Sequence, residues 1–252
     1  MASVLEIKSL NKSFDGIVVA DDINLSLPAG RIVGLIGPNG AGKTSLFNLI
    51  SGVVKPDSGT VTLDGQRLDG RKSYERARLG LSRTWQNLRL FPSLSVLDNL
   101  MIAPRHYHGE SLMRVVFAPG AVRRAEAESR EKALKVLERT GLAAVTYKPA
   151  SDLTFGQQKL VGVARALMND CRCLLLDEPM AGVEGQAYET IQKVVREVAQ
   201  SGVAVCVVEH NVAFIRDLCD EGVFMFAGKV LARGAVGDLI ADPRLTELYF
   251  GT

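Results

Sequence analysis

The sequence predicts an α/β fold in which a buried parallel sheet is combined with an antiparallel β region and an inserted helical region. Three observations predict it. Apolar runs at 31–36, 173–176 and 203–208 are short and end in glycine or charged residues, as buried strands do. The N-terminal segment 4–10 alternates apolar and polar residues, and further short strand signals follow at 18–27 and 60–65. The segment 122–140 is charged but carries apolar residues at helical spacing.

Composition and charge bound the class of protein. The 252 residues make one large domain or two small ones, and a hydrophobic content of 47% supports a sizeable core. With 30 basic and 28 acidic residues the net charge is only +2, which argues against a large nucleic-acid footprint. No apolar stretch approaches the ~18 residues of a membrane span. The start of the chain lacks an export signal.

The cysteines indicate a reduced compartment. Four cysteines in this pattern form no secreted disulfide framework, so a cytoplasmic protein is expected. Cys171 and Cys173 could form a metal or redox pair, but small buried strand residues are the preferred interpretation.

The antiparallel strands are expected first. The segments 4–10 and 18–27 predict two strands, with a bulge in the second at Asp21-Asp22, and 60–65 predicts a short strand with its turn. Phe14 lies between the first two. It is either a core or turn aromatic or a ring that stacks on a nucleotide base.

A phosphate-binding loop follows the strand at 31–36. The pattern G-x-x-x-x-G-K-[ST] occurs at 37–44, and 45–50 predicts a helix directly after it. Glycines let backbone N–H groups point inward around an anion, and the helix aims its positive end at the same place. Lys43 adds a charge for the terminal phosphates, and Thr44 a hydroxyl for Mg²⁺. The residues expected to bind the nucleotide phosphates are Gly37, Pro38, Asn39, Gly40, Ala41, Gly42, Lys43, Thr44 and Ser45.

The middle of the chain is expected to be helical. Ser95 predicts a helix N-cap, with Asp98 three residues on as a weak capping-box acceptor. The helix at 122–140 presents its charges to solvent. Thr154, Gly156 and Gln157 precede a helical run at 159–168, which makes a second helix start able to bind an anion.

Acidic and amide side chains are expected at the carboxyl ends of buried strands, where α/β sheets bind ligands. Asp177 can hold Mg²⁺ through water, and Glu178 can orient or deprotonate a water. Gln86 ends a strand predicted at 81–86 and could reach a metal or a water. Taken alone, each of these residues is commonly a solvated turn residue.

His210 follows the buried run 203–208. That strand should lie near the one that ends at Asp177, which favours a role for His210 in the same site.

In this order the motifs resemble the ATP-binding subunits of ABC transporters over nearly the whole chain. The match is residue by residue: 37–44 is similar to the Walker A element, 173–178 to Walker B, 154–157 to the signature, Gln86 to the Q-loop glutamine, His210 to the switch histidine, and Phe14 to the adenine-stacking aromatic. The stretches 83–92, 177–182 and 242–251 resemble the branched-chain amino acid uptake branch. Thr154 departs from the family, in which Ser is usual.

The resemblance implies the finer organisation. One nucleotide-binding domain, 1–252, is expected, with a P-loop NTPase (RecA-like) core at about 1–87 and 159–252 and a helical subdomain at about 88–158. ATP and Mg²⁺ are the implied cofactors. Thr44, Gln86 and Asp177 are implied to hold the metal, and Lys43, Gln86, Glu178 and His210 to carry the catalysis.

The resemblance also implies partners. The signature of one subunit closes over the ATP of another, so a second ATP-binding subunit is expected, identical or paralogous. Membrane permease subunits are expected near Leu90-Phe91-Pro92, with a solute-binding protein as an indirect partner and no nucleic acid. The chain is then cytoplasmic, on the inner face of the cell membrane.

Other functions stay open at this point. They are a soluble ABC ATPase outside transport, an importer ATPase for another small solute such as urea or an amide, and a nucleotide switch without hydrolysis.

Overall fold

The computed structural model describes residues 3–86, 88–103, 117 and 119–250, in two compact units. The first unit holds Met1–Gln86, Cys171–Ala181 and Val195–Thr252. The second unit holds Asn87–Asp170 and Gly182–Val194. No helix of the described residues combines the length and apolar character needed to cross a membrane.

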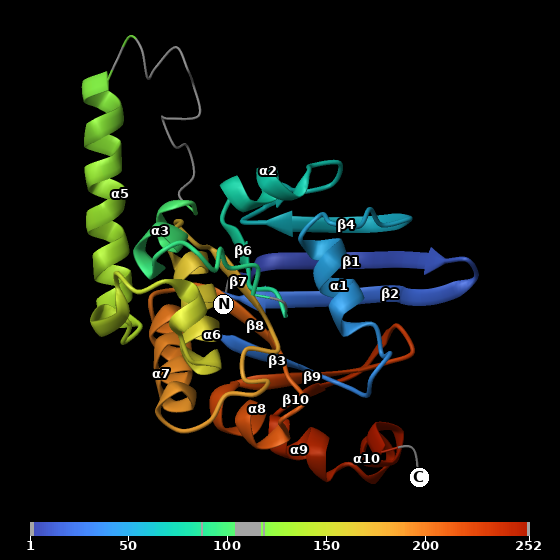
Figure 1. The fold of residues 1–252 in the computed structure, drawn as a ribbon. Coiled ribbons are helices and arrows are strands. Elements are labelled where there is room, and N and C mark those ends of the chain that lie inside the picture. Colours follow the sequence, from blue (N-terminus) through green and yellow to red (C-terminus); the bar gives the residue numbers. More distant parts are fainter. Residues whose placement is uncertain (1–2, 87, 104–116, 118, 251–252) are drawn as a thin grey trace. The chain divides into compact units, whose positions relative to one another are not determined.

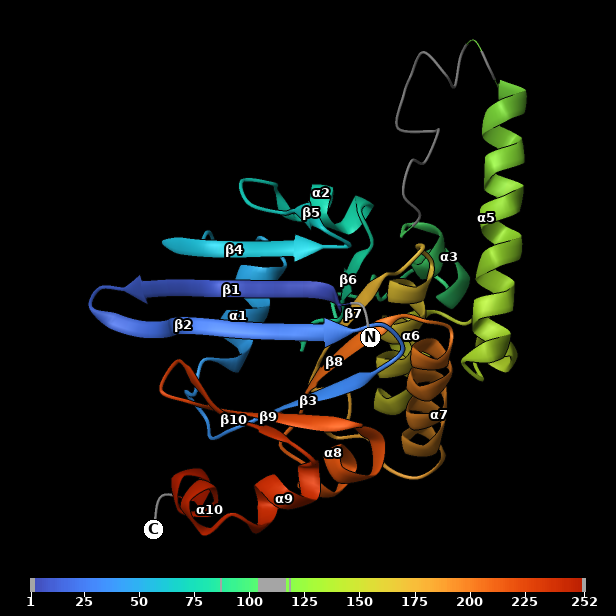
Figure 2. The ribbon, with the colours of Figure 1, turned by 180° about the vertical axis from the view of Figure 1, so that it is seen from behind.

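The first unit contains the predicted antiparallel sheet (Figures 1 and 2). Its strands are β1 (Ser3–Phe14), β2 (Ile17–Pro28), β4 (Ser58–Leu63) and β5 (Gln66–Arg67), in the order β2-β1-β4-β5. The bulge expected in β2 is present. Leu10 pairs with Ile23 and Lys12 with Ala20, so Asp21 and Asp22 oppose a single residue of β1.

The second sheet of this unit has six strands, in the order β10-β9-β3-β8-β7-β6. The strands are β3 (Ile32–Ile36), β6 (Leu81–Arg83), β7 (Cys173–Asp177), β8 (Ala204–Val208), β9 (Glu221–Phe226) and β10 (Lys229–Gly234). All neighbours are parallel except β9 and β10, which form an antiparallel hairpin. The loops that follow β3, β6, β7 and β8 therefore leave from the same edge of the sheet.

Parallel strands buried on both faces explain the apolar runs. Every residue of β3, β7 and β8 is buried. Cys173 and Cys206 are packed strand residues, and burial raises the pKa of both thiols.

Helix α1 (Lys43–Ile50) packs its apolar face into the core of the first unit. Phe47, Leu49 and Ile50 are fully buried there, and each contributes about 1.5–3 kcal/mol of transfer free energy. The C-terminal carbonyls of α1 accept hydrogen bonds from the buried guanidinium of Arg76. Arg76 lies on α2 (Ser73–Arg78), a short helix that the sequence analysis did not predict.

The C-terminal part of the first unit holds α8 (Val212–Leu218), α9 (Val236–Ala241) and α10 (Pro243–Phe250), coloured orange to red in Figure 1. Helix α7 (Gln186–Gln200) begins in the second unit, and from Val195 it belongs to the first.

The second unit is helical, as predicted. It contains α3 (Val96–Met101), α5 (Pro119–Arg139), the 3₁₀ turns Ala143–Val145 and Ala150–Asp152, and α6 (Phe155–Leu167). The predicted cap of α3 is confirmed, because the Ser95 hydroxyl accepts a hydrogen bond from the backbone N–H of Asp98.

Two predicted boundaries are wrong. β6 ends at Arg83 rather than at Gln86, because the next ladder partner on β7, the backbone N–H of Asp177, is bound by the Thr84 hydroxyl instead of by a backbone carbonyl. α6 begins at Phe155 rather than at Lys159. Thr154 caps it and Gln157 closes a capping box, so the helix starts four residues earlier than its apolar periodicity indicates.

Candidate nucleotide-binding site

The loop between β3 and α1 has the backbone that a phosphate cradle needs. Gly42 is the N-cap of α1 with φ 99°, a conformation that favours glycine. A Cβ on Gly37 would lie 2.1 Å from the carbonyl oxygen of Met225. The chain can therefore turn here only with glycine at these two positions. No side chain caps α1 and its first turn holds no acid, so its N-terminal N–H groups face no competing anion of their own helix.

Lys43 is folded onto its own loop. Its Nζ donates hydrogen bonds to the carbonyl oxygens of Gly37, at 2.6 Å, and Pro38, at 2.8 Å. Burial lowers the pKa of the Lys43 amine, and the negative charges of Glu178 and Asp177 partly oppose this. The two carboxylates at the C-terminal end of β7 are thus close enough to act on the lysine of the loop.

The other loop residues divide by exposure. Asn39, Gly40 and Thr44 are exposed, Pro38 and Ser45 are half-buried, and Ala41 is buried. The exposed hydroxyl of Thr44 and the carboxylate of Asp177 are hard oxygen donors of the kind that Mg²⁺ takes together with phosphate oxygens. The loop and these two side chains fit a magnesium nucleotide.

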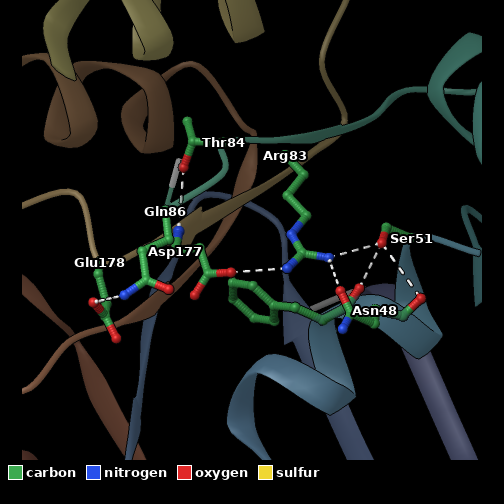
Figure 3. A network of polar contacts seen from close by, with 8 residues as sticks. Asn48, Ser51, Arg83, Thr84, Gln86, Asp177 and Glu178 are labelled. Carbon is green, nitrogen blue, oxygen red and sulfur yellow. Dashed lines mark hydrogen bonds and ion pairs between the residues drawn. The ribbon is translucent and has the colours of Figure 1, made fainter. Parts of the chain in front are cut away.

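Glu178 is held from two sides. Its Oε2 accepts a hydrogen bond from Gln86 Nε2 at 2.8 Å, and its Oε1 lies 3.1 Å from Nε2 of His210 (Figure 3 shows the first of these contacts). The Glu178 side chain is 15% exposed and that of His210 41%. β6, β7 and β8 are neighbours, so the three residues that follow them meet at one edge.

Asp177 has a partner that the sequence analysis did not assign. Its Oδ2 accepts a hydrogen bond from Nη2 of Arg83 at 2.8 Å, and only 3% and 5% of the two side chains are exposed. In Figure 3 the guanidinium of Arg83 lies between Asp177 on one side and Asn48 of α1 and its C-cap Ser51 on the other. The feature of the sequence that could have pointed to Arg83 is an arginine inside a short strand whose other residues are apolar or small.

Glu209 is a second residue that the sequence analysis left without a role. It is 5% exposed, and its carboxylate accepts hydrogen bonds from the backbone N–H of Met180, at 2.6 Å, and of His210, at 3.2 Å. Burial raises the pKa of this carboxyl, and the backbone hydrogen bonds partly offset the effect. Through these two hydrogen bonds Glu209 connects Met180, two residues after Glu178, to the backbone of His210.

Phe14 ends β1 at the turn of the first hairpin. Its side chain is 44% exposed, and Lys12 Nζ lies 4.9 Å from the ring centroid. An exposed ring beside a cation is compatible with stacking on a base, and its role stays a prediction.

Thr154, Gly156 and Gln157 belong to the second unit and form the start of α6. The Thr154 hydroxyl accepts the backbone N–H of Gln157, and the Gln157 amide oxygen accepts the backbone N–H of Thr154. Gly156 is a close-approach position, since a Cβ there would lie 2.8 Å from Cβ of Ala187.

The phosphate loop and the strand-end carboxylates define a nucleotide hydrolase of the P-loop class. The family model described as "ABC transporter" matches residues 20–181, and the chain belongs to that family. It is an ATPase whose hydrolysis of ATP is coupled to transport.

Individual relatives cover the whole chain. It is 35% identical to the probable branched-chain amino acid transport ATP-binding protein LivG of Archaeoglobus fulgidus, over 98% of this chain and 95% of the relative. It is 32% identical to the lipopolysaccharide export system ATP-binding protein LptB of Acidithiobacillus ferridurans, over 100% and 98%. Among solved structures, the ADP conformation of MJ1267, an ATP-binding cassette of an ABC transporter, superposes with a TM-score of 0.85 at 29% identity, over all of both chains.

Proposed function

We propose that this chain is the ATP-hydrolysing subunit of an ABC importer that takes up branched-chain amino acids. The observation that carries the proposal is the shared edge of β3, β6, β7 and β8, from which the Lys43 loop, Gln86, Glu178 and His210 all extend. The solute class is inferred from the relative named for branched-chain amino acid transport.

The nucleotide is bound by the loop and by the hairpin. The N–H groups at the start of α1 and the amine of Lys43 bind the β- and γ-phosphates of ATP, and the Phe14 ring stacks on the base. To do so, Lys43 exchanges its present acceptors, the carbonyls of Gly37 and Pro38, for phosphate oxygens. Both arrangements satisfy the buried amine.

Mg²⁺ neutralises the phosphate charge when it is bound. Thr44, Asp177 and Gln86 are the residues that would hold it. Nε2 of Gln86 donates to Glu178, so its amide oxygen is the atom that can face the metal. One carboxylate with neutral oxygens and phosphates is the ligand set that Mg²⁺ commonly takes.

Glu178 orients and deprotonates the attacking water. Gln86 donates a hydrogen bond to one carboxylate oxygen and His210 lies against the other, so the carboxylate cannot rotate freely from the attacking water toward bulk solvent. His210 then contacts the γ-phosphate from the same edge of the sheet.

The partners follow from parts of the chain outside this site. Thr154, Gly156 and Gln157 act on the ATP of a second ATP-binding subunit, which makes the working state a dimer. A groove of about 730 Å³ between α3 and α5 fits a permease segment, and its lining includes Leu94, Ile102 and Arg123. Phe91, 46% exposed, belongs to the same unit. We place the helical subdomain at about 88–158 within one domain, and the chain on the inner face of the membrane through the permease.

Uptake of radiolabelled leucine, isoleucine and valine tests the proposal in cells that lack this gene. Complementation with the wild-type chain should restore uptake, and complementation with the Glu178→Gln variant should not. If the wild-type chain restores no amino acid uptake but co-purifies with lipid-export components, it would instead act like the lipopolysaccharide export relative.

A further inference from the structure

Arg83 makes an ion pair that is buried on both sides. The side chains of Arg83 and Asp177 are 5% and 3% exposed, and Nη2 of Arg83 lies 2.8 Å from Oδ2 of Asp177. Taking two charges out of water carries a large desolvation penalty, which further hydrogen bonds to the pair offset.

Those contacts come from helix α1. Nη1 of Arg83 donates to Oδ1 of Asn48 at 2.8 Å and to Oγ of Ser51 at 3.0 Å. The guanidinium also lies 4.3 Å from the ring centroid of Trp85 and 5.5 Å from that of Phe47. The planar group is therefore fixed in orientation by acceptors on two of its nitrogens and by aromatic rings.

The contacts join the two halves of the metal site. Asn48 lies on α1 and Ser51 is its C-cap, both within two turns of Thr44, and Asp177 ends β7. Among the described residues, Oδ1 of Asp177 has no hydrogen-bond partner, which leaves that oxygen for a cation or its water.

We propose that Arg83 is a positioning residue that fixes the Asp177 carboxylate relative to α1 and so sets the affinity of the site for its metal ion. This inference rests on the proposed function, since it takes Asp177 and Thr44 as the residues that hold Mg²⁺.

A competing effect has the opposite sign. The positive charge of Arg83 repels a nearby divalent cation, so its removal alone would tighten metal binding. However, removal also leaves a buried carboxylate without the hydrogen bond that orients it. Loss of the residue that hydrogen-bonds a metal ligand typically costs 10–100-fold in metal affinity or activity. The second effect prevails here because Asp177 is almost completely buried and cannot turn to water.

Mn²⁺ titration by electron paramagnetic resonance tests the inference, with the full chain and a non-hydrolysable ATP analogue. Arg83→Lys keeps the charge but cannot reach Asp177, Asn48 and Ser51 together. We expect it to weaken Mn²⁺ binding by about tenfold or more. Asn48 contacts Arg83 but not Asp177, so Asn48→Ala should weaken Mn²⁺ binding by a smaller factor. The affinity for the nucleotide in EDTA should change by less than about twofold in both, which a general loss of structure would not produce.

Arg172→Lys is the matched control. Arg172 makes a 2.7 Å ion pair with Asp64 that is 60% and 37% exposed, and its removal should leave Mn²⁺ affinity unchanged. Equal or tighter Mn²⁺ binding by Arg83→Lys would overturn the inference. Absence of Mn²⁺–nucleotide binding by the wild-type chain would instead contradict the proposed function. If Arg83→Lys fails to fold, Asn48→Ala still decides, because unchanged Mn²⁺ affinity in that variant would also overturn the inference.

Discussion

Glu178 and His210 lie 32 residues apart in the chain, yet Oε1 of one is 3.1 Å from Nε2 of the other. The contact follows from the pairing of β7 with β8, in which Asp177 is opposite Val208 and both strands run the same way. The residues that leave the two strand ends must then lie side by side.

Glu178→Gln should lower the ATPase rate by about 10²–10⁴-fold, the range for a positioned general base, while ATP still binds. The amide is close in shape and can keep the contacts to Gln86 and His210, but it cannot accept the proton from water. Steady-state phosphate release and a nucleotide titration measure the two effects. Glu247→Gln, an exposed change on α10, is the control, and an unchanged rate in Glu178→Gln would remove Glu178 from its role.

Lys43→Ala should weaken ATP binding by about 100-fold or more, since hydrogen bonds to charged groups contribute about 1.5–3 kcal/mol each. It removes a buried amine whose present acceptors are two loop carbonyls. Isothermal titration with ATP measures the loss. Lys132→Ala, which removes a half-buried lysine paired with Asp170 in the helical unit, should bind ATP as the wild type does. Wild-type affinity in Lys43→Ala would contradict the assignment of the loop.

Thr154→Ala should destabilise the chain by about 1 kcal/mol, because it removes the hydroxyl that caps α6. Thr154→Ser keeps the hydroxyl and should be close to neutral. Urea unfolding of the three proteins checks the order of stability. Equal stability of the alanine and serine variants would show that the hydroxyl does not act as a cap.

Glu209 should make stability depend on pH with a defined sign. Burial raises the pKa of its carboxyl in the folded chain above the ordinary 4.5, so the folded state binds more protons than the unfolded state in this window. Wild-type stability relative to Glu209→Gln should then fall as pH rises from 4.5 through the raised pKa. Urea unfolding from pH 4.5 to 8 measures the difference. A difference that grows in favour of the wild type over this range would contradict the burial effect.

Periodicity and motifs predicted most of the framework. The apolar runs predicted β3, β7 and β8, because strands that are buried on both faces consist almost entirely of apolar residues. The bulge at Asp21-Asp22 was predicted from two adjacent acids inside a strand. Thr154 and Gln157 also carried a capping-box signal for the start of α6, but the apolar pattern alone places that start too late.

Other features could not be predicted because they depend on tertiary contacts. The pair Arg83 and Asp177 joins residues 94 positions apart, and nothing in the neighbourhood of Arg83 in the sequence identifies its partner. Helix α2 is short and mostly polar, and it is connected to the rest of the unit by the hydrogen bonds of Arg76 to the end of α1. The division into a core and a helical subdomain at 88 and 158 stays a prediction, as do the roles of Phe14 and the Thr154 segment.

The most direct measurement is a crystal structure of the Glu178→Gln chain with ATP and Mn²⁺, in which anomalous scattering locates the metal. We expect the manganese beside the Thr44 hydroxyl and Asp177, directly or through one water, with the γ-phosphate against Lys43. A metal–nucleotide pair bound elsewhere, or bound to the loop with Asp177 and residue 178 facing away from it, would contradict the convergence of loop and carboxylates.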